Sequence, residues 1–181
     1  MLPPWNPARL VRKVPFNLAL VGGRRQGKST ACSHLVAMMK NKFDLVIAFI
    51  GSAAANPVLH QLMVQHWDPR FFFSEWDQHL IDKLLVQQEK LKKQGRDRHV
   101  CILVDDVILS SGAEEQLAHM ALRGRHFNIS LCMAAVSYTS LPKRVRRSLD
   151  ILFCYSCTMQ GDLSITVCLS MIMSESAREC M

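Results

Sequence analysis

Short, almost wholly apolar runs alternate along the chain with longer segments in which apolar residues recur at helical spacing. The apolar runs cover residues 16–21, 45–50, 71–73, 101–104, 129–136 and 151–155. Several of these runs end at a glycine or at an acidic pair, which is typical of buried strands where the chain leaves a sheet. We therefore expect a strand over each run.

The segments between these runs carry the pattern of amphipathic helices. We expect helices over residues 28–39, 56–66, 74–95 and 111–124. Ser74 with Asp77, and Ser111 with Glu114, resemble capping boxes, in which two side chains satisfy the free N–H groups of a helix start. The apolar faces of these helices have to pack against the sheet.

Strands that alternate with helices over the whole length predict an α/β fold, with a parallel sheet covered by helices on both faces. The 181 residues are enough for a single domain, and we expect about five core strands within residues 16–155. Residues 1–15 are expected to form a proline-rich basic arm. Residues 156–181 are expected to be a divergent or truncated tail, to which we assign no role.

Composition narrows the class of protein only modestly. Apolar residues make up 49% and charged residues 20% of the chain, which excludes a disordered or fibrous protein. The formal net charge is +7, and the sequence pI is near 9.2. A basic balance suits a polyanionic partner such as nucleic acid, although a solvated basic surface has the same composition.

The sequence predicts an intracellular protein. No apolar run approaches the ~20 residues of a membrane helix, and the first fifteen residues lack the apolar centre of a signal peptide. The cysteine count is odd, at seven. Cys154 and Cys157 form a lone C-x-x-C pair without the second pair that a zinc site needs, so we expect reduced thiols.

A glycine-rich segment between the first strand and the first helix carries the strongest chemical signal. It fits G-x-x-x-x-G-K-[S/T], a loop whose backbone N–H groups surround phosphate oxygens at the positive end of a helix. Lys28 is expected to contact the β- and γ-phosphates, and the Ser29 hydroxyl to ligate Mg²⁺. The residues expected to bind the nucleotide are Gly22, Gly23, Arg24, Arg25, Gln26, Gly27, Lys28, Ser29 and Thr30.

An acidic pair supports this nucleotide site. Asp105 and Asp106 directly follow the apolar run at 101–104, and parallel strands present their carboxyl ends at the same edge of a sheet. Asp105 can therefore reach the Mg²⁺ shell. Asp106, on the other side of the strand by simple alternation, can orient and deprotonate a water that attacks the γ-phosphate.

These motifs together resemble a known family. The strings ALVGGRRQGKST, CILVDD, LRGRHFNIS, LCMAAV and LPKRVRRSLD occur in this order. In that order they resemble the genome-packaging ATPases of large nucleocytoplasmic DNA viruses, which are P-loop motors of the FtsK/HerA class. The resemblance covers about residues 16–155. It implies a RecA/FtsK-like three-layer sandwich with a mainly parallel central sheet, and ATP and Mg²⁺ as cofactors.

The resemblance also implies roles for three further positions. Arg125 and Arg146 match family arginines, and either could act as an arginine finger toward the γ-phosphate in a neighbouring subunit; a surface or DNA-phosphate contact is an equal alternative for each. The family generally has a γ-phosphate sensor glutamine at the end of the fourth core strand. Here this place falls on Val136 or Ser137, and the Ser137 hydroxyl could hold a water.

The leading hypothesis for function is an ATP-driven translocase that packages viral double-stranded DNA. By resemblance it would form a homo-oligomeric ring, contact capsid or portal components, and work in the host cytoplasm or in the virion. Its DNA binding should be nonspecific, because phosphate contacts carry no sequence information. The candidate DNA-facing residues are Lys143, Arg144, Arg146 and Arg147, together with Lys90, Lys92, Lys93, Arg96 and Arg98.

Two alternatives remain from the sequence. A nucleoside or nucleotide kinase shares the phosphate loop and the size, although no arginine-rich lid or acceptor pocket is evident. A hydrolysis-deficient nucleotide-binding subunit is suggested by the missing sensor glutamine.

Overall fold

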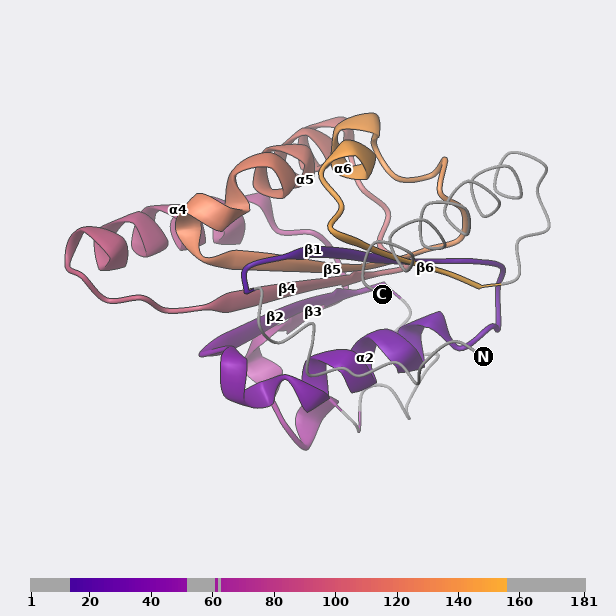
Figure 1. The fold of residues 1–181 in the computed structure, drawn as a ribbon, viewed down its shortest axis with the longest axis horizontal. Coiled ribbons are helices and arrows are strands. Elements are labelled where there is room, and N and C mark those ends of the chain that lie inside the picture. The colour runs from indigo at the N-terminus through magenta and orange to yellow at the C-terminus, as the bar shows by residue number, and fades with distance from the viewer. Residues whose placement is uncertain (1–13, 52–60, 62, 156–181) are drawn as a thin grey trace, which may run out of the picture.

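The structure is a computed structural model that describes residues 14–51, 61 and 63–155 (Figure 1). Strands and helices alternate along it as the apolar pattern predicts. The strands are β1 (Asn17–Val21), β2 (Leu45–Ile50), β3 (Phe72–Phe73), β4 (Val100–Asp105), β5 (Ile129–Ala135) and β6 (Ile151–Cys154). The α-helices are α2 (Lys28–Met38), α4 (Gln78–Lys93), α5 (Ser111–Arg123) and α6 (Lys143–Arg147), with 3₁₀ turns η1 (Lys40–Lys42), η3 (Pro69–Phe71) and η4 (Gly124–Phe127).

All pairings in the described sheet are parallel, and the strand order is β3-β2-β4-β5-β1-β6. The register brings the carboxyl ends of the central strands level with one another. Val21 lies beside Ala135, and Asp105 lies beside both Ala134 and Ile50. The end of β1 and the end of β4 therefore face the same edge, separated only by β5.

Helices cover both faces of the sheet, which makes the predicted three-layer arrangement. Figure 1 shows α2 below the sheet and α4, α5 and α6 above it. Alternate residues of each strand supply the two cores. In β2, Val46 and Ala48 pack on the α2 side, whereas Ile47 and Phe49 pack with α4 and α5.

The structure corrects several details of the sequence-based expectations. The described sheet has a strand at each of the six apolar runs, so all six belong to one sheet and not only about five core strands. Asp77, not Ser74, caps α4, since its side chain accepts from the Leu80 N–H. Ser110, not Ser111, caps α5. Both errors are shifts of the cap position, because a serine or aspartate pattern alone does not say which residue leaves the helical conformation.

Other expectations fall outside the described residues. These are the basic arm up to residue 13, most of the expected helix at 56–66, the tail at 156–181, and Cys157 of the C-x-x-C pair. Within the described residues, no helix combines the length and apolar character needed to cross a bilayer.

A polar cluster fixes the opposite, amino-terminal edge of the sheet. The buried Asn17 side chain donates to the carbonyl oxygens of Ala121 and Ser148, at 2.7 and 2.9 Å. Its backbone N–H donates to Asp150, which also pairs with Arg125. The start of β1 is thereby tied to α5, η4 and the segment before β6.

Candidate nucleotide-binding site

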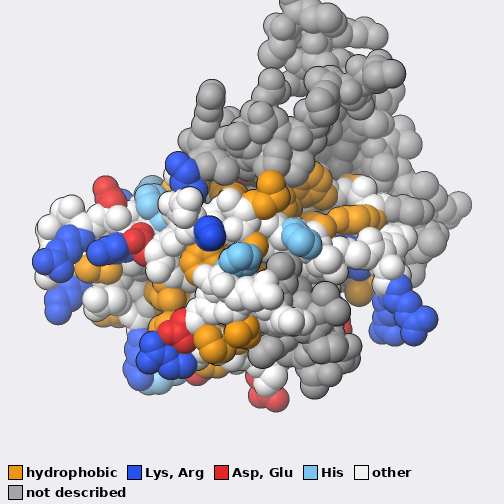
Figure 2. All heavy atoms as spheres, turned by 90° about the horizontal axis from the view of Figure 1, so that it is seen from below, with side chains coloured by type: hydrophobic (Ala, Val, Ile, Leu, Met, Phe, Trp, Pro, Cys, Tyr) orange, Lys and Arg blue, Asp and Glu red, His pale blue; other side chains and the backbone are white. Residues whose placement is uncertain are grey.

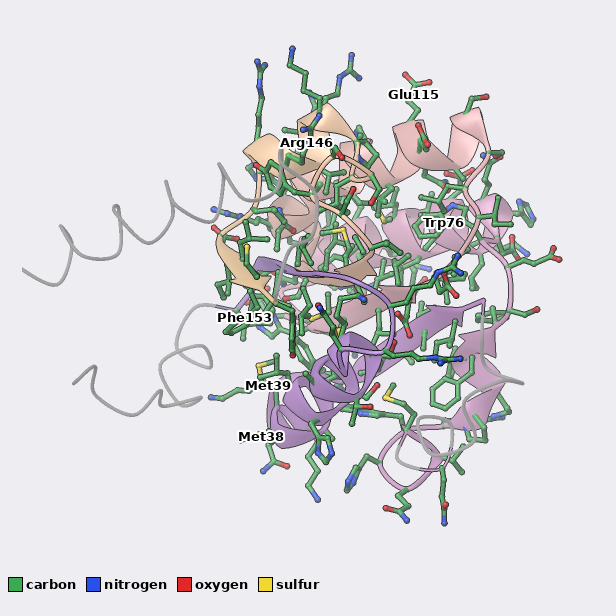
Figure 3. All side chains as sticks on the ribbon, turned by 90° about the vertical axis from the view of Figure 1, so that its right-hand side faces the viewer. Met38, Met39, Trp76, Glu115, Arg146 and Phe153 are labelled. Atoms are coloured by element: carbon green, nitrogen blue, oxygen red, sulfur yellow. The ribbon has the colours of Figure 1, made fainter. Side chains whose placement is uncertain are left out.

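The predicted phosphate loop lies between the end of β1 and the start of α2, at the edge where the strands end (Figures 1 and 3). The Gly22 N–H donates to the carbonyl oxygen of Ala135 in β5 at 3.2 Å. A Cβ atom at Gly22 would stand 2.5 Å from Oε1 of Gln26 and 2.6 Å from Cβ of Tyr155. Only glycine fits at this close approach, so the first loop glycine has a steric function.

The loop ends in a helix start that carries no side-chain cap. Gly27, with φ of 81°, occupies the N-cap position of α2, and Arg25 is also left-handed, with φ of 61°. By contrast, Asp77 and Ser110 cap α4 and α5 with their side chains. The first N–H groups of α2 therefore remain available to an anion, at the positive end of the helix dipole.

Lys28 lies at this helix start with its ammonium folded over the loop. Its Nζ donates to the carbonyl oxygen of Gly23 at 2.6 Å, which leaves two of its three protons for other acceptors. Desolvation by partial burial lowers the pKa of Lys28, while the nearby charges of Asp105 and Asp106 oppose this shift. The structure thus brings the lysine and both carboxylates together, as the hypothesis of a nucleotide site requires.

Asp105 ends β4 as a buried carboxylate with an incomplete set of partners. It is 3% exposed, and its Oδ2 atom has no hydrogen-bond partner among the described residues. Burial is the largest effect and raises the pKa of Asp105, and the Asp106 charge acts in the same direction. A hydrogen bond from Ser29 and the charge of Lys28 oppose the rise. A buried, unsatisfied oxygen beside a serine hydroxyl is well suited to a cation.

Asp106 follows in a conformation that strand alternation does not predict. The strand ends at Asp105, and Asp106 adopts a left-handed φ of 52° on the exposed side of the edge. Its direction therefore comes from this turn and not from the pleat of β4. A non-glycine residue in this region is strained, which is common at functional sites.

The donor set fits a magnesium–nucleotide complex better than a metal held by protein alone. Within the described residues, no group of three or more His, Cys, Asp and Glu side chains could hold an ion. Ser29 and Asp105 instead offer one hydroxyl and one carboxylate, and Mg²⁺ in nucleotide sites takes few protein ligands and completes its shell with phosphates and water.

The position of the missing sensor glutamine lies directly beside the loop. Ala135, the last residue of β5, bonds to Gly22, and Val136 and Ser137 follow at the same edge. The Ser137 side chain shares a hydrogen bond with the Thr139 hydroxyl at 2.9 Å and accepts from the Ser140 N–H at 3.1 Å. It is thus placed near the loop but is engaged within its own turn.

The two candidate arginines occupy different parts of the molecule. Arg125 lies in η4 before β5, at the amino edge of the sheet, and pairs with Asp150, so it does not face the phosphate loop of the same chain. Arg146 lies on α6, labelled in Figure 3, with its guanidinium carbon 5.3 Å from the centre of the Tyr138 ring. Its Nε atom is buried without a hydrogen bond to any described residue.

A second hollow at this edge contains none of the predicted site residues. Its volume is about 720 Å³, and it lies between the end of β3 and the starts of α4 and α5, near Trp76 (Figure 3). The phosphate-loop site is therefore assigned by its chemistry and not by the size of a cavity.

Comparison with protein-family models identifies the family. The model described as Poxvirus A32 protein matches residues 7–178. The chain belongs to the Poxvirus A32 protein family. This match covers nearly the whole sequence and confirms the resemblance to large-DNA-virus ATPases inferred from the motifs. No curated protein matches the sequence at a significant level.

Solved structures similar to this A32-family chain confirm the P-loop α/β fold. The DNA-packaging ATPase B204 from Sulfolobus turreted icosahedral virus has a TM-score of 0.59 at 14% identity, over 84% of this chain and 81% of that one. The packaging NTPase B204 of turreted icosahedral virus 2, in complex with ATP-γS, has a TM-score of 0.52 at 16% identity, over 88% and 80%. The cytoplasmic domain of EssC has a TM-score of 0.58 at 18% identity over 81% of this chain, which spans only 32% of that domain.

Sequence reasoning missed one residue that shapes the site. Gly51 follows β2, and its N–H donates to the carbonyl oxygen of Asp105 at 3.0 Å. A Cβ atom at Gly51 would stand 2.0 Å from the carbonyl oxygen of Asp106. The sequence shows this glycine only as a strand end, since the partner segment lies more than fifty positions away in the chain.

We predict that Gly51→Ala lowers ATP turnover much more than ATP affinity. The added methyl collides with the Asp106 backbone and must displace the carboxylate that follows β4, whereas the phosphate loop is not touched. Steady-state kinetics and calorimetric binding measure the two effects. Gly95→Ala is the control, because Gly95 is strained by a φ of +70° but has open space around its Cβ position. It should reduce stability without changing turnover, and equal turnover losses in both variants would contradict the prediction.

We also predict that Asp105→Asn raises the thermal stability of the nucleotide-free protein at pH 8. The pKa of Asp105 is raised in the folded state, so its protonated form is favoured there, and stability is lost as pH rises through that pKa. The gain in Tm should shrink as pH falls toward the ordinary range of aspartate, about 4.

Asp44→Asn provides a control of opposite sign. Burial raises the pKa of Asp44, but hydrogen bonds from Arg98 and the His99 N–H outweigh it and leave the pKa lowered. This variant should lose stability at pH 8, and the loss should fade in acid. A lower Tm for Asp105→Asn than for the native protein at pH 8 would contradict the prediction. It would show that the buried carboxylate of native Asp105 has sufficient hydrogen-bond partners.

Proposed function

We propose that this protein is an ATP-hydrolysing motor that moves double-stranded DNA into a viral capsid. One observation carries the proposal: the uncapped start of α2, Lys28 and the buried Asp105 converge at one edge of the sheet in a chain of the A32 family. The similar fold of two viral packaging ATPases, one of them in complex with ATP-γS, supports it. ATP and Mg²⁺ are the proposed cofactors.

Each residue at this edge of the sheet has a separate role in nucleotide binding or hydrolysis. The free N–H groups at the start of α2 and the remaining protons of Lys28 bind phosphate oxygens. Ser29 and Asp105 provide the oxygen ligands for Mg²⁺, which when bound neutralises phosphate charge during transfer. The exposed Asp106 orients a water and accepts its proton.

A neighbouring subunit would complete the site within a homo-oligomeric ring. We assign the arginine-finger role to Arg146 rather than Arg125. Arg125 already pairs with Asp150 in the cluster at the amino edge, whereas Arg146 is partly exposed and forms no ion pair with described residues. A cation placed at the γ-phosphate stabilises the transition state of hydrolysis. Capsid or portal components are the proposed further partners.

DNA contact is best supported for the α6 segment. Val145 is fully buried and anchors this short helix, while Lys143, Arg144 and Arg147 are exposed and form no ion pair with described residues. Of the basic residues around the end of α4, Lys92 donates to the carbonyl oxygen of His126, and Lys93 and Arg98 form ion pairs. The α6 charges are therefore freer to bind phosphates.

The hydrogen bonds of Ser137 favour one alternative, a nucleotide-binding subunit that does not hydrolyse ATP. Its hydroxyl is held within its own turn, at the position where a sensor glutamine would stand. The same turnover experiment decides between this alternative and a motor.

We predict that the purified protein hydrolyses ATP and that duplex DNA increases the rate. Lys28→Ala should abolish nucleotide binding, because the ammonium that faces the loop is lost. Asp106→Asn should keep ATP affinity but lower kcat about 10²-fold or more, as loss of a general base does. Phosphate release and calorimetry measure these effects. Binding of ATP without turnover, with and without DNA, would establish the idle subunit, and phosphate transfer to a nucleotide would establish a kinase.

We further predict that replacing Lys143, Arg144 and Arg147 together by Ala weakens duplex binding and flattens its salt dependence. Each lost phosphate contact lowers the slope of log K against log salt by about 0.9, so three contacts lower it by about 2 to 3. Fluorescence anisotropy at several salt concentrations measures the slope. The control replaces Lys92, Lys93 and Arg98, which already have carbonyl or carboxylate partners within the protein. A larger change of slope in the control would show that DNA binds to the basic residues around the end of α4 instead of those on α6.

A further inference from the structure

A groove of about 260 Å³ lies between α2 and the edge strand β6. Its floor is formed by Leu20 of β1, and Phe153 and Tyr155 line one side of it. Ala31, His34 and Met38 line the α2 side, and Met38 is 60% exposed. Figure 3 labels Phe153 and Met38 at the same side of the molecule, and Figure 2 shows hydrophobic and histidine side chains together on the α2 face.

This groove begins where the phosphate loop ends. Ala31 comes three residues after Lys28, in the first turn of the same helix. Tyr155 follows β6, and its N–H donates to the carbonyl oxygen of Val21 at 2.8 Å, next to the first loop glycine. Its Cβ atom fills the space that a side chain at Gly22 would need. Loop and groove therefore share their walls.

The strand order sets the direction in which a bound nucleotide must lie. β1, which carries the loop, has β5 and then β4 on one side and β6 on the other. Asp105 at the end of β4 attracts the metal-bound, γ-phosphate end of the chain. The nucleoside end then points away from β4, toward β6. With a helix rise of 1.5 Å per residue, Ala31 lies about 4.5 Å and His34 about 9 Å along α2 from Lys28, within the span of a ribose and a base.

The chemistry of the groove suits a nucleobase held by its faces. Aromatic rings and aliphatic side chains bind the flat face of a base by stacking and apolar contact. Apart from the His34 imidazole and the Tyr155 hydroxyl, the described lining side chains carry no polar group that could read the hydrogen-bonding edge of a base. A site of this kind discriminates weakly between bases, in contrast to one that hydrogen-bonds its ligand.

We propose that this groove is the base subsite of the nucleotide site, and that Tyr155 is the residue on which a purine stacks. The assignment rests on the proposed function, in that the loop must bind a nucleoside triphosphate. It adds a binding role for Tyr155, directly after β6, and it implies that ATP and GTP bind with affinities within about tenfold of each other.

Calorimetric titration of the full chain with Mg-ATP, Mg-GTP and inorganic tripolyphosphate tests the proposal. Tripolyphosphate uses the loop but has no base. Tyr155→Leu should weaken ATP binding about tenfold and leave tripolyphosphate binding unchanged, because the loss of one stacking ring affects only the base. Tyr155→Phe should restore ATP affinity. Val86→Ala, at an exposed apolar residue of α4, is the matched control and should bind all three ligands as the native chain does.

The possible failures are distinguishable. Unchanged ATP affinity in Tyr155→Leu would overturn the base subsite and leave the proposed ATPase intact. An equal loss for ATP and tripolyphosphate would also overturn it, since Tyr155 would then act only by supporting Gly22. A preference for one purine above about 100-fold would show that the edge of the base is read elsewhere. If the native chain binds none of the three ligands, the proposed function itself fails.

Discussion

Parallel pairing holds β5 between β1 and β4, and all three strands end at the same edge of the sheet. At a spacing of about 4.8 Å per strand, the backbones of β1 and β4 lie about 10 Å apart. Side chains bridge this distance, since Ser29 at the start of α2 donates a hydrogen bond to Asp105 at the end of β4. A shift of one residue in either pairing would turn Asp105 toward the other face. The site therefore depends on the register of buried apolar strands that carry no chemistry of their own.

The same edge holds groups that are poorly satisfied without a ligand. The α2 start lacks a cap, Asp105 is a buried carboxylate with a free oxygen, and partial burial lowers the pKa of Lys28. Each of these states costs stability in the free protein. A magnesium–triphosphate complex bound as proposed would satisfy them together, and ligand binding would then be coupled to folding stability at this site.

The opposite edge of the sheet has a different character. There Asn17, Arg125 and Asp150 satisfy one another and the ends of the neighbouring segments. The amino ends of β1 and β6 are thus fixed by direct hydrogen bonds, while at the carboxyl edge the start of α2 and Asp105 at the end of β4 have donors and an acceptor without partners among the described residues. Arg125 illustrates the difference, because the resemblance implies a possible arginine finger, whereas in this structure the side chain pairs with Asp150.

The sequence by itself determined the alternating α/β fold, the phosphate loop and the acidic pair, because each follows from local spacing: apolar runs, a glycine pattern and a strand end. It did not determine which serine or aspartate caps α4 and α5, the turn at Asp106, or the close approach of Gly51 and Tyr155 to the loop segments. These depend on backbone atoms that are distant in the chain and meet only through strand order. Tertiary packing alone decided them, since steric fit between such segments leaves no periodic trace in the sequence.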